Sequence, residues 1–124
     1  MFSALIIFRY ENGDLEYLSS TDPDAGYQKV EEETITATVN EGGYVFWYAG
    51  GGVSDLIGIE FDEESRERLQ GDPTGWVFHK FWVAAVGQNV GDELLKYEIL
   101  YQHFNEDGES EIIRLDPKIG VENE

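Results

Sequence analysis

Hydrophobic and polar residues alternate along most of this 124-residue chain, and glycine-containing turns interrupt the alternation. A period of two is typical of β-strands that bury one face. The clearest example is residues 3–10 and 15–19, which flank Asn12 and Gly13. Asn-Gly favours a two-residue hairpin loop of type I′. The sequence therefore predicts a β-hairpin over residues 3–19.

On both faces of this hairpin, the side chains fit the strand register that a two-residue loop imposes. A two-residue loop places Phe8 opposite Tyr17 on the face that we expect to be buried. The same register places Arg9 opposite Glu16 on the other face. Because each face gains a favourable cross-strand pair, this is the register that we predict.

A second hairpin is predicted for residues 34–39 and 44–48, joined by a turn at residues 40–43. Its register leaves Val45 and Trp47 on the same face as the threonines of the first strand. An apolar pair on an otherwise polar face needs either a second layer of structure or a partner. We therefore expect Trp47 to contact a partner. The aromatic residues expected beside the apolar face of the first strand are Tyr44, Phe46 and Tyr48.

Three further strands and one helix are predicted. Residues 56–61 form a short strand, residues 76–85 a central strand with apolar residues on both faces, and residues 94–104 the longest strand. Asp62 suits the N-cap of a short surface helix near residues 62–70, because acidic residues fill its first turn.

The last hairpin has two candidate registers. A two-residue loop would pair Tyr101 with Arg114, whereas a three-residue loop that ends at Gly108 pairs Tyr101 with Ile113. The hydrophobic pattern favours the second register, because it places apolar residues opposite each other.

Pro117 removes a donor from any strand ladder, so we expect residues 117–124 to form an edge or a loosely ordered tail. Strands at regular spacing with turn residues between them are typical of a sandwich. The predicted fold is therefore all-β: an antiparallel two-sheet β-sandwich of about seven strands, with one short surface helix near residues 62–70. We expect residues 1–124 to form a single domain.

The last quarter of the chain resembles a known family. A Tyr-rich strand, an Asp-Gly turn and an Asp-Pro-x-Ile step follow one another at residues 97–101, Asp107-Gly108 and Asp116-Pro117-Lys118-Ile119. Together they resemble the closing strand pair of the AidA/PixA-like bacterial inclusion-body proteins. Ile113-Arg114-Leu115 stands where that family has glycine and aromatic residues. The resemblance implies a β-sandwich and no enzymatic activity.

Composition narrows the choice of partners. The chain has 26 acidic and 8 basic side chains and a net charge of −18 at pH 7, with a pI of about 4.2. Such a surface repels nucleic-acid phosphates and anionic lipids, so we expect neither nucleic acid nor membrane as a direct partner. Because 41% of residues are hydrophobic and 14% are aromatic, the chain has enough apolar side chains to fold. It has no cysteine, which favours a cytoplasmic location.

The sequence contains no catalytic motif that we recognise. The segment 52–56 lacks the final glycine of a nucleophile elbow, and the glycine run 50–52 lacks the Lys-Ser/Thr of a phosphate loop. The two histidines, His79 and His103, lie in strand patterns, where packing is the expected role. In the favoured register His103 faces Glu111. We therefore expect a protein that is not an enzyme and that needs no cofactor.

Acidic side chains in two loops make a ligand-binding function a second possibility. Asp22 and Asp24 share one loop, and Asp107 and Glu109 share another. Calcium ions prefer such ligands, although neither segment has EF-hand spacing. Exposed aromatic side chains can also stack on sugars. A lectin-like or calcium-assisted ligand-binding sandwich is therefore one alternative, and a structural or assembly subunit that forms an oligomer is another.

The acidity favours a protein partner of opposite charge. We expect a non-enzymatic acidic protein-binding module that engages a basic protein, of the kind represented by inhibitors, immunity proteins or DNA mimics. The predicted contacts are one apolar pair and two acidic segments: Val45, Trp47, Glu31, Glu32, Glu33, Asp62, Glu63 and Glu64.

Overall fold

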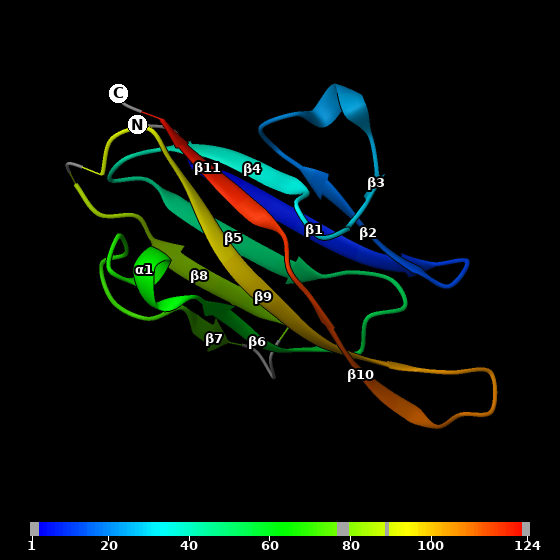
Figure 1. The fold of residues 1–124 in the computed structure, drawn as a ribbon. Helices are drawn as coiled ribbons and strands as arrows, with labels where there is room; N and C mark the ends of the chain where they lie inside the picture. The colour runs from blue at the N-terminus through cyan, green and yellow to red at the C-terminus, as the bar shows by residue number, and fades with distance from the viewer. Residues whose placement is uncertain (1–2, 77–79, 89, 123–124) are drawn as a thin grey trace.

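Two β-sheets make up most of the structure, a computed structural model that describes residues 3–76, 80–88 and 90–122. One sheet has six strands in the order β3-β2-β1-β5-β8-β7, and the other has five (Figure 1). The strands of the first sheet are β1 (Ala4–Glu11), β2 (Asp14–Ser19), β3 (Gln28–Lys29), β5 (Tyr44–Ala49), β7 (Thr74–Trp76) and β8 (Phe81–Ala85). Those of the second are β4 (Ile35–Asn40), β6 (Asp55–Phe61), β9 (Glu93–Phe104), β10 (Ser110–Leu115) and β11 (Lys118–Glu122).

The all-β prediction is confirmed, but the strand count and pairing differ from it. The described residues form eleven strands rather than about seven. Both sheets are mixed, because β1 pairs parallel to β5 and β11 pairs parallel to β4. Apolar side chains from both sheets form a common core between them. The arrangement is thus sandwich-like without being purely antiparallel.

The first hairpin has the predicted register. Phe8 pairs with Tyr17, and Arg9 pairs with Glu16, where the guanidinium Nε lies 2.7 Å from the carboxylate. Asn12 has a φ angle of 53° and Gly13 one of 86°, as a type I′ loop requires. Local turn chemistry and the alternation therefore suffice to define this unit.

The second predicted hairpin does not form. β4 and β5 belong to different sheets, and β5 is an interior strand between β1 and β8. Its inward side chains are Val45 and Trp47, which are 1% and 0% exposed. The second sheet is thus the second layer that the apolar pair was expected to need, and the expectation that Trp47 and Val45 contact a partner is wrong. Both faces of β5 are apolar, so the alternation could not decide which face the second sheet covers.

The predicted strand over residues 76–85 is two strands. β7 and β8 pair antiparallel, with Trp76 opposite Phe81 and Gly75 opposite Trp82. His79 lies outside the described residues. The indole of Trp82 occupies the space above Gly75, where an added Cβ would lie 2.6 Å from Cε2 of that ring.

We expect Gly75→Ala to lower the free energy of unfolding by about 1–3 kcal/mol, because the new methyl group overlaps the Trp82 ring. Urea denaturation followed by tryptophan fluorescence measures the change. Gly51→Ala is the matched control, because no atom lies within 4 Å of its Cβ position. Equal stability of the two variants would contradict the packing of β7 on β8.

In the C-terminal segment the predicted register of the last hairpin is confirmed, whereas the predicted loose tail is wrong. β9 and β10 have the three-residue-loop register, with Tyr101 opposite Ile113, and Gly108 has a φ angle of 79°. The segment after Pro117 is not a loose tail. Residues 118–122 form β11, which pairs with both β9 and β4 and buries Ile119 completely. Pro117 precedes the strand, where the lack of a donor costs no ladder bond.

The helix is shorter than predicted. α1 spans Glu63–Arg66, and Asp62 caps it by accepting a hydrogen bond from the backbone N–H of Ser65 at 2.7 Å. A single 3-10 turn, η1 (Pro23–Ala25), is also present. Among the described residues, no helix has the length and apolar character needed to cross a membrane.

A chain of hydrogen bonds crosses the core between the sheets. The indole N–H of Trp47 donates to the hydroxyl of Tyr97 at 3.3 Å, and this hydroxyl lies 2.5 Å from Oγ1 of Thr36. Thr36 in turn donates to the carbonyl of Lys118 at 3.3 Å. Each buried side-chain polar atom in this series of hydrogen bonds therefore has a partner, which offsets the cost of burying it. The chain joins β5, β9, β4 and β11.

Candidate functional site

The outward side of the six-stranded sheet carries a row of large apolar side chains. The row crosses five strands, because Ile7 pairs with Leu18 and Tyr48, and Phe81 pairs with Tyr48 and Trp76. A second row runs beside it from β1 to β8. We define the aromatic face as the residues of both rows together with the adjacent Tyr44: Leu5, Ile7, Leu18, Tyr44, Phe46, Tyr48, Trp76, Phe81 and Val83.

The rings of the aromatic face pack against one another. Phe81 is central, with its centroid 5.8 Å from that of Phe46 and 6.4 Å from those of Tyr48 and Trp76. The planes of these pairs are inclined by 42°, 66° and 24°. Such mixed edge and face contacts are the ones aromatic rings prefer in protein cores. The face therefore has the internal packing of a core, without a covering layer.

This face is nevertheless open to solvent. Trp76 is 56% exposed, Tyr44 47% and Tyr48 45%. β5 lies in the middle of the sheet, flanked by β1 and β8 (Figure 1), so the exposure of its tyrosines is not an effect of a sheet edge. A solvent-facing sheet surface ordinarily alternates polar residues outward. Large aromatic side chains at its centre therefore need an explanation.

Charge is excluded from the same area. In the described strands β5, β7 and β8, no outward position holds a charged residue. Charged side chains on this side of the sheet begin at Arg9, whose guanidinium lies over the Tyr27 ring at 3.7 Å from its centroid. Glu11 and Glu16 pair with the same guanidinium at 3.1 and 2.7 Å. Although the chain has 26 acidic residues, none occupies an outward position of these three described strands.

The acidic segments predicted from the sequence lie elsewhere. Glu32, Glu33 and Asp62 come together in a groove of about 470 Å³ beside β6, β9 and the β10–β11 connection. Glu31, Glu63 and Glu64 are exposed but do not line it. Three basic residues also line the groove, and sequence reasoning missed them: Lys96, Arg114 and Lys118.

Ion pairs already balance part of this groove. Arg114 lies 3.1 Å from the Glu98 carboxylate, and Lys118 lies 3.9 Å from that of Glu33. The mixed charge makes the groove a weaker attractor for a basic partner than the acidic segments alone suggested. These cations come from β9, β10 and β11, and only knowledge of the pairing of these strands could have brought them together.

The proposed calcium ligands remain in separate turns. Asp22 and Asp24 flank Pro23 in η1, and Asp107 and Glu109 lie in the β9–β10 turn. In the part of the chain that the structure describes, no group of three or more His, Cys, Asp or Glu side chains is arranged to hold a metal ion.

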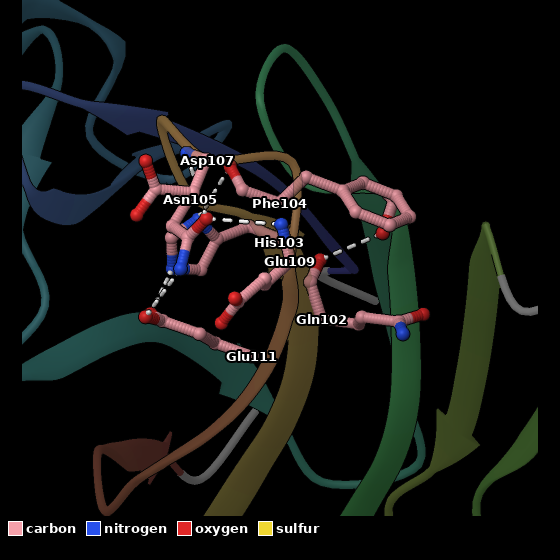
Figure 2. Close-up of polar contacts among 8 residues, drawn as sticks. Gln102, His103, Phe104, Asn105, Asp107, Glu109 and Glu111 are labelled. Carbon is pink, nitrogen blue, oxygen red and sulfur yellow. Dashed lines mark hydrogen bonds and ion pairs between the residues drawn. The ribbon is translucent and has the colours of Figure 1, made fainter.

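A polar cluster supports the β9–β10 turn from within. Nε2 of His103 lies 3.0 Å from the Glu111 carboxylate, as the favoured register predicted, and Asn105 Nδ2 donates to the other oxygen of that carboxylate at 3.3 Å. Figure 2 shows both bonds converging on Glu111. Oδ1 of Asn105 accepts the backbone N–H groups of Asp107 and Glu109, each at 3.0 Å.

The His103 ring is packed on one face and bonded at both nitrogens. The Tyr10 ring stacks on His103 with centroids 4.0 Å apart, and Nδ1 lies 3.3 Å from the carbonyl oxygen of Phe104. Because both ring nitrogens are engaged and the side chain is buried, the imidazole is poorly placed for proton transfer to a substrate. The hydrogen bonds of this cluster therefore stabilise the turn between β9 and β10.

No protein-family model matches this chain, and neither does any curated protein. The resemblance of its last quarter to inclusion-body proteins therefore stays a prediction. The aromatic face is the candidate functional site that the structure itself provides.

Proposed function

We propose that this protein is a non-enzymatic protein-binding module that contacts a basic partner through its aromatic face. The observation that carries the proposal is the presence of exposed aromatic residues and the absence of charge on β5, β7 and β8 in a protein whose net charge is −18. In this proposal Tyr48 and Trp76, rather than Trp47, are the side chains expected to anchor the partner.

The composition of the aromatic face fits a protein interface. The centres of interfaces are enriched in Tyr, Trp and Phe and depleted of charged residues. Trp and Tyr also provide a large share of the residues whose removal most weakens binding. The acids on the rest of the protein would act at longer range, by raising the rate of encounter with a positively charged protein.

The ring geometry favours a protein over a sugar. A sugar-binding platform presents ring faces outward to stack on the ligand. Here the three rings around Phe81 are inclined to it by 24°, 42° and 66°, so the rings do not form one flat platform. An irregular apolar surface of this kind suits interdigitating side chains. A second copy of the chain is disfavoured as the partner, because each copy carries a charge of −18.

DNA mimicry is a narrower form of this hypothesis. The composition of the aromatic face favours apolar contact with a protein over imitation of DNA. Imitation of a phosphate backbone requires regularly spaced carboxylates on the contact surface. The outward positions of β5, β7 and β8 carry none. The supported form is therefore apolar contact, with the net negative charge of the protein favouring a basic partner. Inhibition of that partner follows only if the contact covers its active site.

We expect substitution of Tyr48 and Trp76 by serine to abolish capture of the partner from native lysate. The matched control is Ile35→Ser with Leu94→Ser, because these side chains are 49% and 51% exposed on the other sheet. The immobilised wild type and control should retain one protein that the Tyr48/Trp76 variant loses. Raising the salt from about 50 to 500 mM should weaken that capture, because it screens the long-range attraction.

Three outcomes would contradict the proposal. Equal capture by all three proteins would mean that the aromatic face is not the contact surface. Capture that does not respond to salt would remove the role of charge. Elution by a neutral oligosaccharide would instead support the lectin-like alternative.

A further inference from the structure

The edges of the two sheets are protected to different degrees. Edge strands expose unpaired N–H and C=O groups, and natural proteins shorten, bend or cover them. β3 has two residues and β7 has three. The open side of β4 bonds to the side chains of Tyr17 and Thr21. β6 has an irregular register, and its Leu56 carbonyl accepts a hydrogen bond from the indole N–H of Trp82.

β10 has none of these protections. It is six residues long, it contains no proline or lysine, and its register on β9 is regular. In the described structure it pairs with β9 alone. In Figure 1 the β9–β10 hairpin extends beyond the neighbouring strands. β10 is therefore a six-residue strand of regular register with one side unpaired in the described structure.

The ladder alternation identifies the groups on that open side. The backbone N–H of Asn105 donates to the carbonyl of Glu109 at 2.9 Å. In an antiparallel pair, alternate residues point their N–H and C=O toward the partner strand. Odd-numbered residues of β10 thus bond to β9, whereas Ser110, Ile112 and Arg114 direct their N–H and C=O groups outward. All three are exposed, and Ile112 is 67% exposed.

The hairpin is already ordered for binding. His103, Asn105 and Glu111 fix the turn and the first half of β10 from the inner side (Figure 2). An acceptor strand that is rigid before binding loses little conformational entropy when a ligand adds to it. The hydrogen bonds of this cluster use none of the backbone groups of Ser110, Ile112 or Arg114.

The acidic residues around β10 favour a ligand of positive charge. Glu106, Asp107, Glu109 and Glu111 lie in the turn and on the strand. The single basic residue of β10, Arg114, is paired with Glu98 at 3.1 Å. We propose that β10 accepts an extended, basic segment of another protein as an added strand, with Lys or Arg alternating with β-branched residues. Main-chain bonds would give affinity, and alternate side chains would give specificity.

This inference stands apart from the proposed function. Ile112 belongs to the five-stranded sheet, whereas the aromatic face lies on the six-stranded sheet. Variants at one surface therefore leave the other unchanged, and the two proposals can fail separately. A second copy of the chain is the less favoured occupant of β10, because it would bring its own acids to the same edge.

The test uses an acetylated hexapeptide of alternating lysine and valine as the probe. We expect it to bind the full chain, to slow hydrogen exchange of the Ile112 and Arg114 amides, and to leave Tyr48 and Trp76 signals unchanged. Ile112→Pro should weaken binding by about tenfold or more. That residue's N–H faces outward, so proline removes no bond to β9. Ile112→Val is the control and should bind as the wild type does.

Several results would overturn the inference. These are absence of binding at millimolar peptide, equal binding by Ile112→Pro, and equal binding of a hexapeptide of alternating glutamate and valine. Chemical-shift changes confined to the aromatic face would assign the peptide to the other surface. Concentration-dependent dimerisation lost in Ile112→Pro, measured by sedimentation, would identify a second copy as the occupant and refute a basic partner.

Discussion

Trp47→Ala is expected to lower the free energy of unfolding by about 3–5 kcal/mol, the usual cost of deleting a large buried aromatic side chain. Trp47 is 0% exposed, and its ring lies 5.6 Å from Tyr97 and 6.2 Å from Phe61 between centroids. The substitution also removes the donor that begins the Trp47–Tyr97–Thr36 chain. Since small proteins are stable by only about 5–15 kcal/mol, this loss is a large fraction of the total.

The neighbouring residue on β5 provides the control. Tyr48 faces outward and is 45% exposed, so Tyr48→Ala should cost under about 1 kcal/mol. Urea denaturation at neutral pH measures both variants. If Trp47→Ala does not fold, Trp47→Phe keeps the test, with an expected loss of about 1–3 kcal/mol. A greater loss from Tyr48→Ala than from Trp47→Phe would mean that the two faces of β5 are assigned the wrong way round.

The second large effect is expected in alkaline solution. Burial raises the pKa of the Tyr97 phenol far above its ordinary value, although its hydrogen bonds with Thr36 and Trp47 act in the opposite direction. Burial also raises the pKa of Tyr101, and the nearby Tyr10, Asp14 and Glu111 add to the effect. Both phenols therefore stay protonated in the folded protein at a pH where the unfolded chain ionises them.

The sign of the pH dependence follows from this difference. An unfolded tyrosine has a pKa of about 10, so above that pH the unfolded chain binds fewer protons than the folded protein. Stability is complete below about pH 10 and is lost as the pH rises, at about 1.4 kcal/mol per pH unit for each fully protected phenol. The raised pKa values of Tyr97 and Tyr101 both act in this direction.

Urea denaturation between pH 8 and pH 12 measures this loss, and absorbance at about 295 nm reports ionised tyrosine. Tyr97→Phe is the informative variant: it should be less stable at neutral pH but show a shallower decline in alkali, by up to one proton. Tyr48→Phe, at a side chain that is 45% exposed, is the matched control. Ionisation of all seven tyrosines near pH 10, with the fold intact, would contradict the burial of these phenols.

Local and non-local parts of the fold differed in how far the sequence could predict them. The hairpins at Asn12-Gly13 and Gly108 were predicted to the residue, because loop chemistry and the alternation of adjacent strands determine their registers. The parallel pairings of β1 with β5 and of β4 with β11 join segments that are distant in the chain. No local turn encodes such a pairing, so a hairpin between β4 and β5 was the natural but incorrect expectation.

The candidate site shows the same division. The alternation on β5 correctly separated Val45 and Trp47 from the three aromatic residues between and beside them. It could not tell which set faces the core, because that depends on the sheet packed against it. Trp76 and Phe81 became neighbours only through the β7–β8 pairing, which the continuous apolar pattern of residues 76–85 concealed.

The position of β11 has a consequence for synthesis of the protein. β11 lies between β9 and β4, so the five-stranded sheet is incomplete until residues 118–122 have left the ribosome. Folding must therefore wait for nearly all of the described chain, and the non-local pairing makes it slow. During that interval the nascent chain exposes β4, β9 and its apolar faces, a state prone to association. The mutual repulsion of chains with a charge of −18 opposes that association before the core exists.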